Sequence, residues 1–263
     1  INVLWNHHNT NQPAVQSYKD KTLLDQIQYF VYVSHWQYEK YRYAFSIPTE
    51  RSVVIPNATA TRELSRKPGK IKLIYTSTPW RGLDILLDAF ELLQRDDVEL
   101  DIYSSTLIYG SAFAAANEAH FAPLFDRAKR MRHVNYHGHA SHAEVLAALD
   151  ESHIFAYPCT WEETSCLSAI EAGLAGLSIV TTNLGALYET VGPWADLIPF
   201  DNNRTLLTQQ FAQRLNQAID EFWTDPVQEQ LQAQHASFKR FYTWEHRLPE
   251  WQRFFQSIQT GPI

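Results

Sequence analysis

The fold is decided by residues 153–171, which read HIFAYPCTWEETSCLSAIE. The apolar run His153–Tyr157 is typical of a buried strand, and a polar loop follows it. A helix is expected over Ser165–Ala175 and another apolar strand over Leu177–Thr182. A strand, a helix and a second strand in this order indicate two parallel strands joined by a crossover helix.

The same alternation continues on both sides of this stretch. From residue 71 onward six strands are expected, at Ile71–Ser77, Val98–Tyr103, His133–His137, His153–Tyr157, Leu177–Thr182 and Asp196–Phe200. Helices separate the strands, and further amphipathic helices close the chain near Arg204–Trp223, Pro226–Phe241 and Trp244–Ile258. The predicted fold class is therefore α/β, with a doubly wound parallel sheet that binds ligands at the carboxyl ends of its strands.

The first 58 residues contain fewer elements. Apolar runs at Asn2–Trp5, Tyr29–Val33 and Val53–Ile55 predict short strands, and His35–Ala44 predicts a helix. About three such units are too few for a second sheet of the usual size. The polar stretch 59–70 is interpreted as a linker between this partial domain and the complete one.

Composition places the chain among globular proteins. It has 263 residues, of which 45% are hydrophobic and 19% charged, and this excludes a disordered chain. The net charge of −7 argues against nucleic acid as a partner, because duplex binding needs a dense basic surface. No apolar run approaches the ~20 residues of a transmembrane segment, and no basic signal-peptide region is found at the start. Cys159 and Cys166 are expected to be free thiols in a reducing cytoplasm.

The loop 76–82, TSTPWRG, is a candidate anion site between a strand and a helix. Backbone N–H groups at a helix N-terminus favour negative charge, and Arg81 adds a guanidinium that can bind a phosphate through two hydrogen bonds. The alternative is an ordinary loop, in which Gly82 allows tight packing and Arg81 lies in solvent. The loop matches neither GxGxxG nor the Walker A motif, so its residues alone do not decide between the two.

The loop and helix after residue 160 contain two carboxylates, Glu163 and Glu171. Glu163 precedes the helix, and Glu171 lies about two turns inside it among small and apolar residues. Because an unpaired buried carboxylate is costly, Glu171 is expected to accept hydrogen bonds, for example from sugar hydroxyls. In the alternative interpretation Glu163 caps the helix and Glu171 points to solvent.

Taken in order along the chain, several segments resemble one family. They are Val54–Ala58, Tyr75–Phe90, His137–Gly138, Pro158–Glu171, Leu187–Val191 and Tyr242–Glu245. They resemble the motifs VIPNG, GR…KG with LLxAF, hxG, the E-x₇-E stretch, lpEiv and ysWe of the family-4 retaining glycosyltransferases of the group 1 type. The resemblance covers about residues 53–258 and implies a GT-B fold.

The resemblance gives each part of the chain an expected place in that fold. Residues 71–241 would form a complete nucleotide-sugar-binding domain with a doubly wound parallel sheet. Residues 1–58 would form a truncated, Rossmann-like acceptor-side domain, joined by the linker 59–70. The C-terminal segment 242–263 would be a helix that crosses back toward the N-terminal part.

The resemblance also implies a role for each matched residue. Arg81 resembles the basic residue that neutralises the donor diphosphate, Glu163 the carboxylate at the transferred sugar, and Glu171 the carboxylate at the ribose. His7 resembles a histidine at the donor sugar, and an exposed loop histidine is the alternative. The implied catalytic residues are His7, Arg81 and Glu163, and the implied donor-binding residues are Ser77, Thr78, Arg81, Gly82, His137, Gly138, Glu163, Ser165, Cys166, Leu167 and Glu171.

The chain departs from the family pattern at one of its two cationic positions. Tyr75 and Thr76 stand where the family has Gly-Arg. Either Arg81 suffices together with the neighbouring hydroxyl groups, or Arg62 or Arg66 supplies the second positive charge. We interpret this difference as divergence and not as loss of activity.

A zinc site is an alternative use of four histidines, which are His133, His137, His139 and His142. The spacing of the first two simply lines one face of a strand, and no Cys or carboxylate pattern completes a ligand set. The prediction is therefore no metal and no resident cofactor, with a nucleotide-sugar such as a UDP- or GDP-hexose as co-substrate.

Three functions remain open at this point. The first is a glycosyltransferase that moves a hexose from a nucleotide-sugar to a saccharide, lipid or other acceptor with retention of configuration. The second is a non-catalytic nucleotide-sugar-binding module or a fragment of a two-domain enzyme, since the chain starts at Ile1 and not at Met. The third is another doubly wound nucleotide-binding protein, such as a nucleotide-sugar epimerase. A cytoplasmic location is expected, with peripheral membrane association, a homo-oligomer or a separate N-terminal partner as further possibilities.

Overall fold

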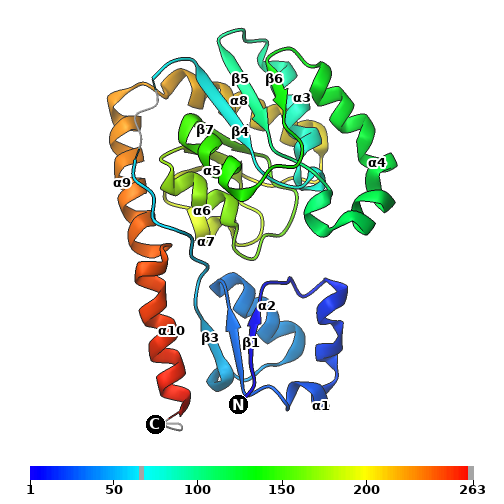
Figure 1. Cartoon of the computed structure of the whole chain (residues 1–263), viewed down its shortest axis with the longest axis vertical. Coiled ribbons are helices and arrows are strands. Elements are labelled where there is room, and N and C mark those ends of the chain that lie inside the picture. The colour runs from blue at the N-terminus through cyan, green and yellow to red at the C-terminus, as the bar shows by residue number, and fades with distance from the viewer. Residues whose placement is uncertain (65–67, 260–263) are drawn as a thin grey trace.

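The computed structural model describes residues 1–64 and 68–259, which form a larger and a smaller α/β body (Figure 1). The larger body contains a six-stranded sheet in the order β6-β5-β4-β7-β8-β9, in which every neighbouring pair is parallel. Its strands are β4 (Ile71–Tyr75), β5 (Val98–Ile102), β6 (Val134–Tyr136), β7 (Ile154–Tyr157), β8 (Ser178–Thr182) and β9 (Ala195–Ile198). The predicted α/β class and the six parallel strands are confirmed.

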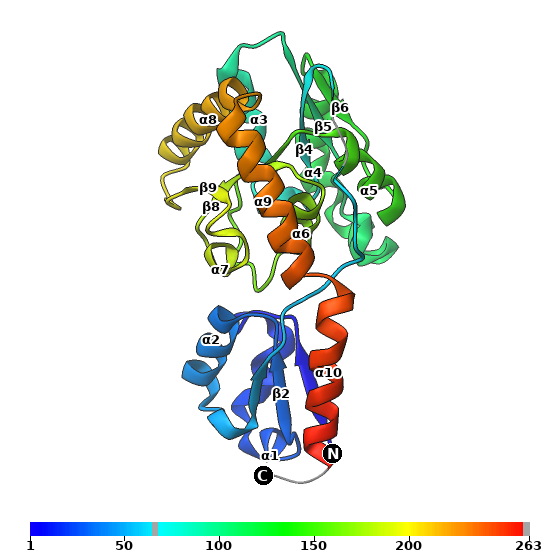
Figure 2. The same cartoon turned by 90° about the vertical axis from the view of Figure 1, so that its left-hand side faces the viewer.

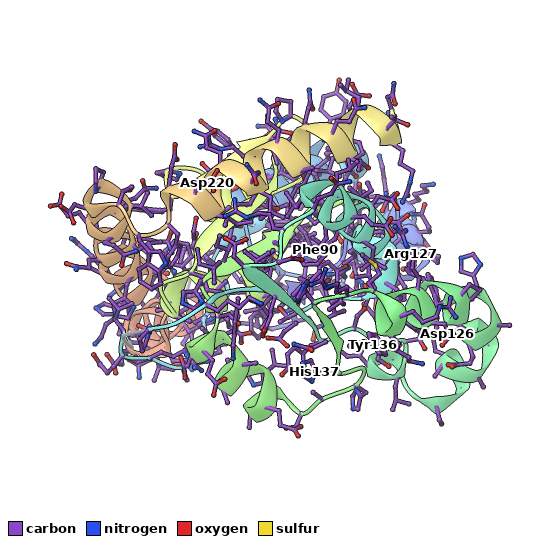
Figure 3. The ribbon with its side chains drawn as sticks, turned by 90° about the horizontal axis from the view of Figure 1, so that it is seen from above. Phe90, Asp126, Arg127, Tyr136, His137 and Asp220 are labelled. Carbon is purple, nitrogen blue, oxygen red and sulfur yellow. The ribbon has the colours of Figure 1, made fainter. Side chains whose placement is uncertain are left out.

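Helices cover both faces of this sheet. Seen from above, α8 with Asp220 and α3 with Phe90 lie on one side of the strands, and α4 with Arg127 lies at the edge (Figure 3). The other face is covered by α5 and α6, and α9 packs on α6. The bounds are α3 (Leu83–Leu93), α4 (Ser111–Arg130), α5 (His142–Glu151), α6 (Leu167–Leu174), α7 (Leu187–Val191), α8 (Arg204–Glu221) and α9 (Asp225–Phe241), with short 3-10 turns at η3 (Pro79–Arg81) and η4 (Leu107–Tyr109).

The burial of the strands reflects this two-sided cover. All four residues of β7 are buried, because β7 lies between β4 and β8 and is covered by helices on both faces. In β5, which lies nearer the edge, burial alternates, and the buried side chains are Val98, Leu100 and Ile102. The carboxyl ends of all six strands point toward the smaller body, as Figure 1 shows for β4 and β7.

The smaller body has a three-stranded parallel sheet in the order β1-β2-β3. Its elements are β1 (Val3–Asn6), η1 (Pro13–Lys19), α1 (Lys21–Leu24), β2 (Tyr29–Tyr32), α2 (His35–Phe45), η2 (Thr49–Arg51) and β3 (Ser52–Val54). The central strand places alternate side chains on opposite faces. Phe30 and Tyr32 pack with Tyr41 of α2, and Val31 packs with Phe254 of the last helix, α10 (Trp244–Gln259).

The C-terminal helices connect the two bodies. α9 packs on the larger body, and α10 continues along the same side of the molecule to the small sheet (Figure 2). The indole of Trp251 meets the indole of Trp5 with 5.0 Å between ring centroids, and Phe254 meets Tyr29 at 5.7 Å. The last four residues of the segment predicted over 242–263 lie outside the described residues.

The predicted linker 59–70 is bonded to the rest of the chain at its beginning. Thr59 donates its N–H to the carbonyl of Tyr242 (2.9 Å) and accepts from the N–H of Trp244 (3.2 Å). Glu63 pairs with Lys239 at 2.7 Å. This part of the linker therefore follows α9 and α10, while residues 65–67 lie outside the described residues.

None of the helices in the described ranges, 1–64 and 68–259, has the length and apolar character that crossing a membrane requires.

Candidate functional site

A cavity of about 470 Å³ opens at the carboxyl ends of β4, β5 and β6, against α5 and α6. Residues after each of the three strands line it, together with residues from the two helices. They include Thr76, Ser77, Thr78 and Arg81 after β4, Tyr103 and Tyr109 after β5, Gly138 and His142 after β6, and Ser168 and Glu171 from α6. Five of the predicted donor-binding residues line this cavity, namely Ser77, Thr78, Arg81, Gly138 and Glu171.

Arg81 joins the two loops that the sequence singled out. Its Nη1 donates to Oε1 of Glu163 at 2.8 Å, and the hydroxyl of Tyr157 donates to the same oxygen at 2.6 Å. Glu163 is only 6% exposed. Burial by itself would lower the pKa of Arg81, but Glu163 and the other neighbouring acidic groups together outweigh it, so the pKa is raised and Arg81 stays cationic. Burial also raises the pKa of Tyr157, which therefore remains a proton donor to Glu163.

Polar groups without partners surround this arginine. The hydroxyls of Thr76 and Thr78 and the Nε of Arg81 are buried and have no hydrogen-bond partner within the described part of the chain. Buried polar groups are nearly always paired, and each exception needs an explanation. All three belong to residues that line the cavity, so a ligand rich in acceptor oxygens would satisfy them.

Glu171 lines the same cavity from α6. One of its carboxylate oxygens, Oε1, accepts from the Thr59 hydroxyl at 3.3 Å and lies 2.7 Å from Nε2 of His142. Nearby, Ser168 donates its hydroxyl to the carbonyl of Thr76 at 2.9 Å and so ties α6 to the loop after β4. The expectation that Glu171 is buried and hydrogen-bonded agrees with this geometry, and the solvent-facing alternative does not.

Gly82, a predicted donor-binding residue, does not line the cavity. Its φ of +103° falls in the left-handed region, and a Cβ on this residue would lie 2.0 Å from the carbonyl oxygen of Pro158. The loop that carries Arg81 therefore touches the loop that leads to Glu163, with no room for a side chain. This is the tight packing that the alternative interpretation of the loop expected.

Other predicted donor-binding residues lie beside the cavity. The ring of His137 stacks on Tyr103 with 4.3 Å between centroids, and its Nε2 lies 2.8 Å from Oδ1 of Asp101. Cys166 is buried directly before α6, and Leu167 begins that helix with a side chain 44% exposed. The carbonyl of Ser165 accepts from the amide of Asn57 at 3.3 Å.

His7 follows β1 and lies at the boundary between the two bodies. Its carbonyl accepts from the hydroxyl of Thr164 at 3.0 Å, and its ring lies against Trp5 with 4.5 Å between centroids. His7 is an exposed loop residue, as the alternative interpretation expected, but the partial burial of its ring lowers its pKa, and the neighbouring His8 lowers it further. The structure thus brings His7 next to the loop that carries Glu163.

Acidification should cost the protein stability through His7. The unfolded chain binds a proton near the ordinary pKa of about 6.5, above the folded value, so the free energy of unfolding should fall as the pH drops through that window. Removing the ring in His7→Gln should make urea-unfolding curves at about pH 7.5 and about pH 5.5 differ less than in the wild type. His8→Gln, which removes only the neighbouring charge, should give an intermediate result. An unchanged pH dependence in His7→Gln would contradict the assignment.

Arg62 does not supply a second positive charge to the cavity. Arg62 donates to the carbonyl of Leu146 at 2.7 Å and pairs with Asp150, so its guanidinium is bound to α5. It does not line the cavity. Arg66, the other candidate, lies outside the described residues.

Three of the four histidines weighed as a zinc site have separate partners. His133 lies 3.2 Å from Asp96, while His137 and His142 contact Asp101 and Glu171. In the described part of the chain there is no group of three or more His, Cys, Asp or Glu that could hold a metal ion.

Sequence reasoning missed two polar partners at the site. Tyr157 was assigned only to a buried strand, although a tyrosine at the carboxyl end of a strand, directly before the Pro158 loop, could have signalled a hydrogen bond to Glu163. His142 was considered only as a metal ligand. Its place directly after the helix cap Ser141 could have indicated that it faces the cavity.

Comparison with protein families gives a direct assignment. Residues 60–240 match the family described as "Glycosyl transferases group 1". The chain belongs to this family. The match covers the whole six-stranded sheet and its helices, and it includes Arg81, Glu163 and Glu171.

Solved structures extend the likeness over nearly the whole chain. A glycosyltransferase from Rickettsia africae is 15% identical with a TM-score of 0.74, over 99% of this chain and 71% of that one. Anabaena HepE in complex with UDP is 16% identical with a TM-score of 0.76, over 97% and 72%.

The pneumococcal O-GlcNAc transferase GtfA, in complex with UDP and GlcNAc, is 17% identical with a TM-score of 0.72. That match covers 98% of this chain but only 52% of the pneumococcal protein. No protein with a curated description matches the chain. At these identities the structures show the fold alone, which is of the GT-B type predicted from the sequence.

Proposed function

We propose that this group 1 glycosyltransferase moves a hexose from a nucleoside-diphosphate sugar to an acceptor with retention of configuration. The observation that carries the proposal is the set of buried donors around Arg81. Arg81, Thr76 and Thr78, whose Nε and hydroxyls have no partner in the described part of the chain, all line one cavity, and a diphosphate would supply acceptor oxygens to them. This cavity lies where parallel α/β sheets bind their ligands.

In the proposed reaction the bond between the sugar and the diphosphate breaks, and negative charge develops on the leaving group. Arg81 would stabilise that charge, because a preorganised cation in a partly buried site acts strongly on developing charge. The backbone N–H groups of Cys166 and Leu167, at the start of α6, and the side chains of Ser77 and Ser165 would add polar contacts. With charge neutralised in this way, the proposed reaction needs no resident metal or cofactor.

The remaining parts of the donor would be held by residues around the cavity. Glu163 would contact the transferred hexose, and Glu171 the ribose hydroxyls, while His137 and Gly138 would lie near the base. The complexes of HepE with UDP and of GtfA with UDP and GlcNAc support a UDP-sugar donor, and GDP-hexose is the alternative.

The acceptor would approach from the smaller body, where His7 is the proposed contact to the donor sugar. The small sheet of three strands offers few loops for an acceptor, which is a saccharide, lipid or other molecule in this proposal. We propose a cytoplasmic location for the protein, in keeping with its two buried free thiols.

A second candidate function is a nucleotide-sugar-binding module without turnover. It is favoured by the three-stranded sheet of the smaller body, which offers few loops for an acceptor. Membership in a glycosyltransferase family removes the reason to consider an epimerase.

Ligand-induced stabilisation followed by a release assay tests the proposal. UDP, GDP and their glucose and mannose derivatives should raise the melting temperature when their base and sugar fit, because binding to the folded state stabilises it. Nucleoside diphosphate should then be released only when an acceptor from a saccharide and lipid panel is added. Stabilisation without release would favour the binding module, and no stabilisation by any nucleotide would contradict both candidates.

A further inference from the structure

A carboxylate of the larger body binds the N-terminus of a helix in the smaller one. Oε1 of Glu189, in α7, accepts from the backbone N–H of His35 at 2.8 Å, and Oε2 accepts from the N–H of Trp36 at 2.8 Å. These two residues begin α2, and Figure 2 shows α7 and α2 facing each other across the boundary. The first N–H groups of a helix lack partners within it and carry partial positive charge, so a carboxylate is a suited ligand.

The helix that Glu189 holds also holds the segment around His7. The fully buried amide of Gln37, in the first turn of α2, donates to the carbonyl of His8 at 2.9 Å and to that of Asn6 at 3.3 Å. The hydroxyl of Tyr41, one turn later, donates to the His8 carbonyl at 3.0 Å. The two carbonyls on either side of His7 are thus fixed by α2.

A second set of contacts joins the same segment to the loop that carries Glu163. Oε2 of Glu162 accepts from the amide of Asn9 at 2.8 Å, and its Oε1 lies 3.4 Å from Nζ of Lys40 in α2. The Thr164 hydroxyl donates to the His7 carbonyl. The loop 162–164 is therefore bound to the His7 segment on both sides of Glu163.

We infer that Glu189 is a positioning residue for sugar transfer, which fixes α2 on the larger body and thereby holds His7 at the Glu163 loop. The inference rests on the proposed function. Glu189 does not line the donor cavity and does not contact Arg81 or Glu163 in any described interaction. Its effect on transfer can reach Glu163 through α2 and the His7 segment, or through Ala186 at the start of α7, whose N–H donates to the carbonyl of Glu163 at 2.7 Å. The inference assigns the first route, which a His7 variant can separate from the second, and donor binding to the larger body should not depend on Glu189.

Glu189→Gln tests this assignment. A carboxamide has one acceptor oxygen, and its NH₂ group would face the second helix N–H, so the variant keeps the shape but loses the paired contact. We expect kcat for transfer to fall by about tenfold to a hundredfold, since a displacement of ~1 Å at reacting groups can cost that much. The KM for UDP-glucose and the Kd for UDP should change by less than about twofold, because the substitution leaves the residues that bind the donor in the ground state unchanged. Amide hydrogen exchange at His35 and Trp36 should become faster.

Two controls separate positioning from general damage. Glu221→Gln, an exposed glutamate at the far end of α8 that accepts from Gln217, should leave kcat and exchange at α2 unchanged. In a His7→Gln background, Glu189→Gln should lower kcat by less than about twofold, because residues that act through one another are not additive.

The outcomes distinguish this inference from the proposed function. An unchanged kcat in Glu189→Gln, or a parallel loss of UDP binding, would overturn the positioning role. Full additivity with His7→Gln would overturn the route through His7. If the wild type released no UDP with any acceptor, the proposed function would fail. Amide exchange alone would then test whether Glu189 fixes α2: faster exchange at His35 and Trp36 in Glu189→Gln would support it, and unchanged exchange would reject it.

Discussion

Arg81→Ala should abolish the rise in melting temperature that UDP or a UDP-hexose produces in the wild type, and should lower transfer by about 10²–10³-fold. Arg81 is the cation of the cavity and pairs with Glu163 at 2.8 Å while its Nε remains unpartnered. A diphosphate bound there would lose its planar, bidentate partner in the variant. At a ligand concentration of about 100 Kd the wild type gains about 2.7 kcal/mol, so the loss is easily measured.

The design must separate lost binding from lost folding. Arg81→Ala leaves Glu163 buried with only the Tyr157 hydroxyl, so the free variant should itself melt at a lower temperature. The measured quantity is therefore the ligand-induced shift of each variant from its own baseline. Arg81→Lys keeps the charge but not the planar fork, and should retain part of the shift.

Arg95→Ala is the matched control. Arg95 lies between α3 and the amino end of β5, pairs with Asp97 and with Asp220 of α8, and does not line the cavity. This variant should lose stability and keep the full ligand-induced shift. A shift in Arg81→Ala as large as that in the wild type would show that the diphosphate is held elsewhere.

The parts of the molecule that were predictable from sequence are those with local patterns. The strand, loop and helix of residues 153–171 appear in the structure as β7, its loop and α6, because burial on both faces makes β7 apolar throughout. Arg81 and Glu171 could be named because a cation in a strand-to-helix loop and a carboxylate among small residues are unusual in themselves. The cavity that Arg81 and Glu171 both line follows from the order of the strands, which single-strand patterns do not encode.

The contacts that were not predictable join residues far apart in the chain. Glu189 reaches His35 across 154 positions, and Thr164 reaches His7 across 157. Neither pair leaves a periodic signal, since an exposed glutamate on a short helix is common on any surface. Arg62 is a residue whose suggested role was wrong for the same reason. The sequence offered it as a second cation for the donor, but its partner Asp150 becomes apparent only when α5 packs beside the linker.

Gly82→Ala should lower the free energy of unfolding by about 4 kcal/mol. The donor site should lose its folded structure as a result. Two effects combine, a left-handed φ that costs ~1–3 kcal/mol in any other residue and a steric overlap that costs ~1–3 kcal/mol when a packed site cannot yield. The Cβ would lie 2.0 Å from the carbonyl oxygen and 2.9 Å from the carbonyl carbon of Pro158, and backbone atoms cannot rotate away as a side chain would. The loops that carry Arg81 and Glu163 would have to separate.

Gly110→Ala measures the backbone effect without the overlap. Gly110 has a φ of +92°, and a Cβ there would meet no atom within 4 Å. Urea unfolding should therefore give a smaller loss for this variant, about 1–3 kcal/mol, with its response to UDP intact. Equal losses in the two glycine variants would show that the overlap with Pro158 relaxes, and that close contact between the two loops is not what holds Arg81 beside Glu163. A larger loss in Gly82→Ala, accompanied by loss of the UDP response, would show that the contact of loop with loop supports both the fold and the donor site.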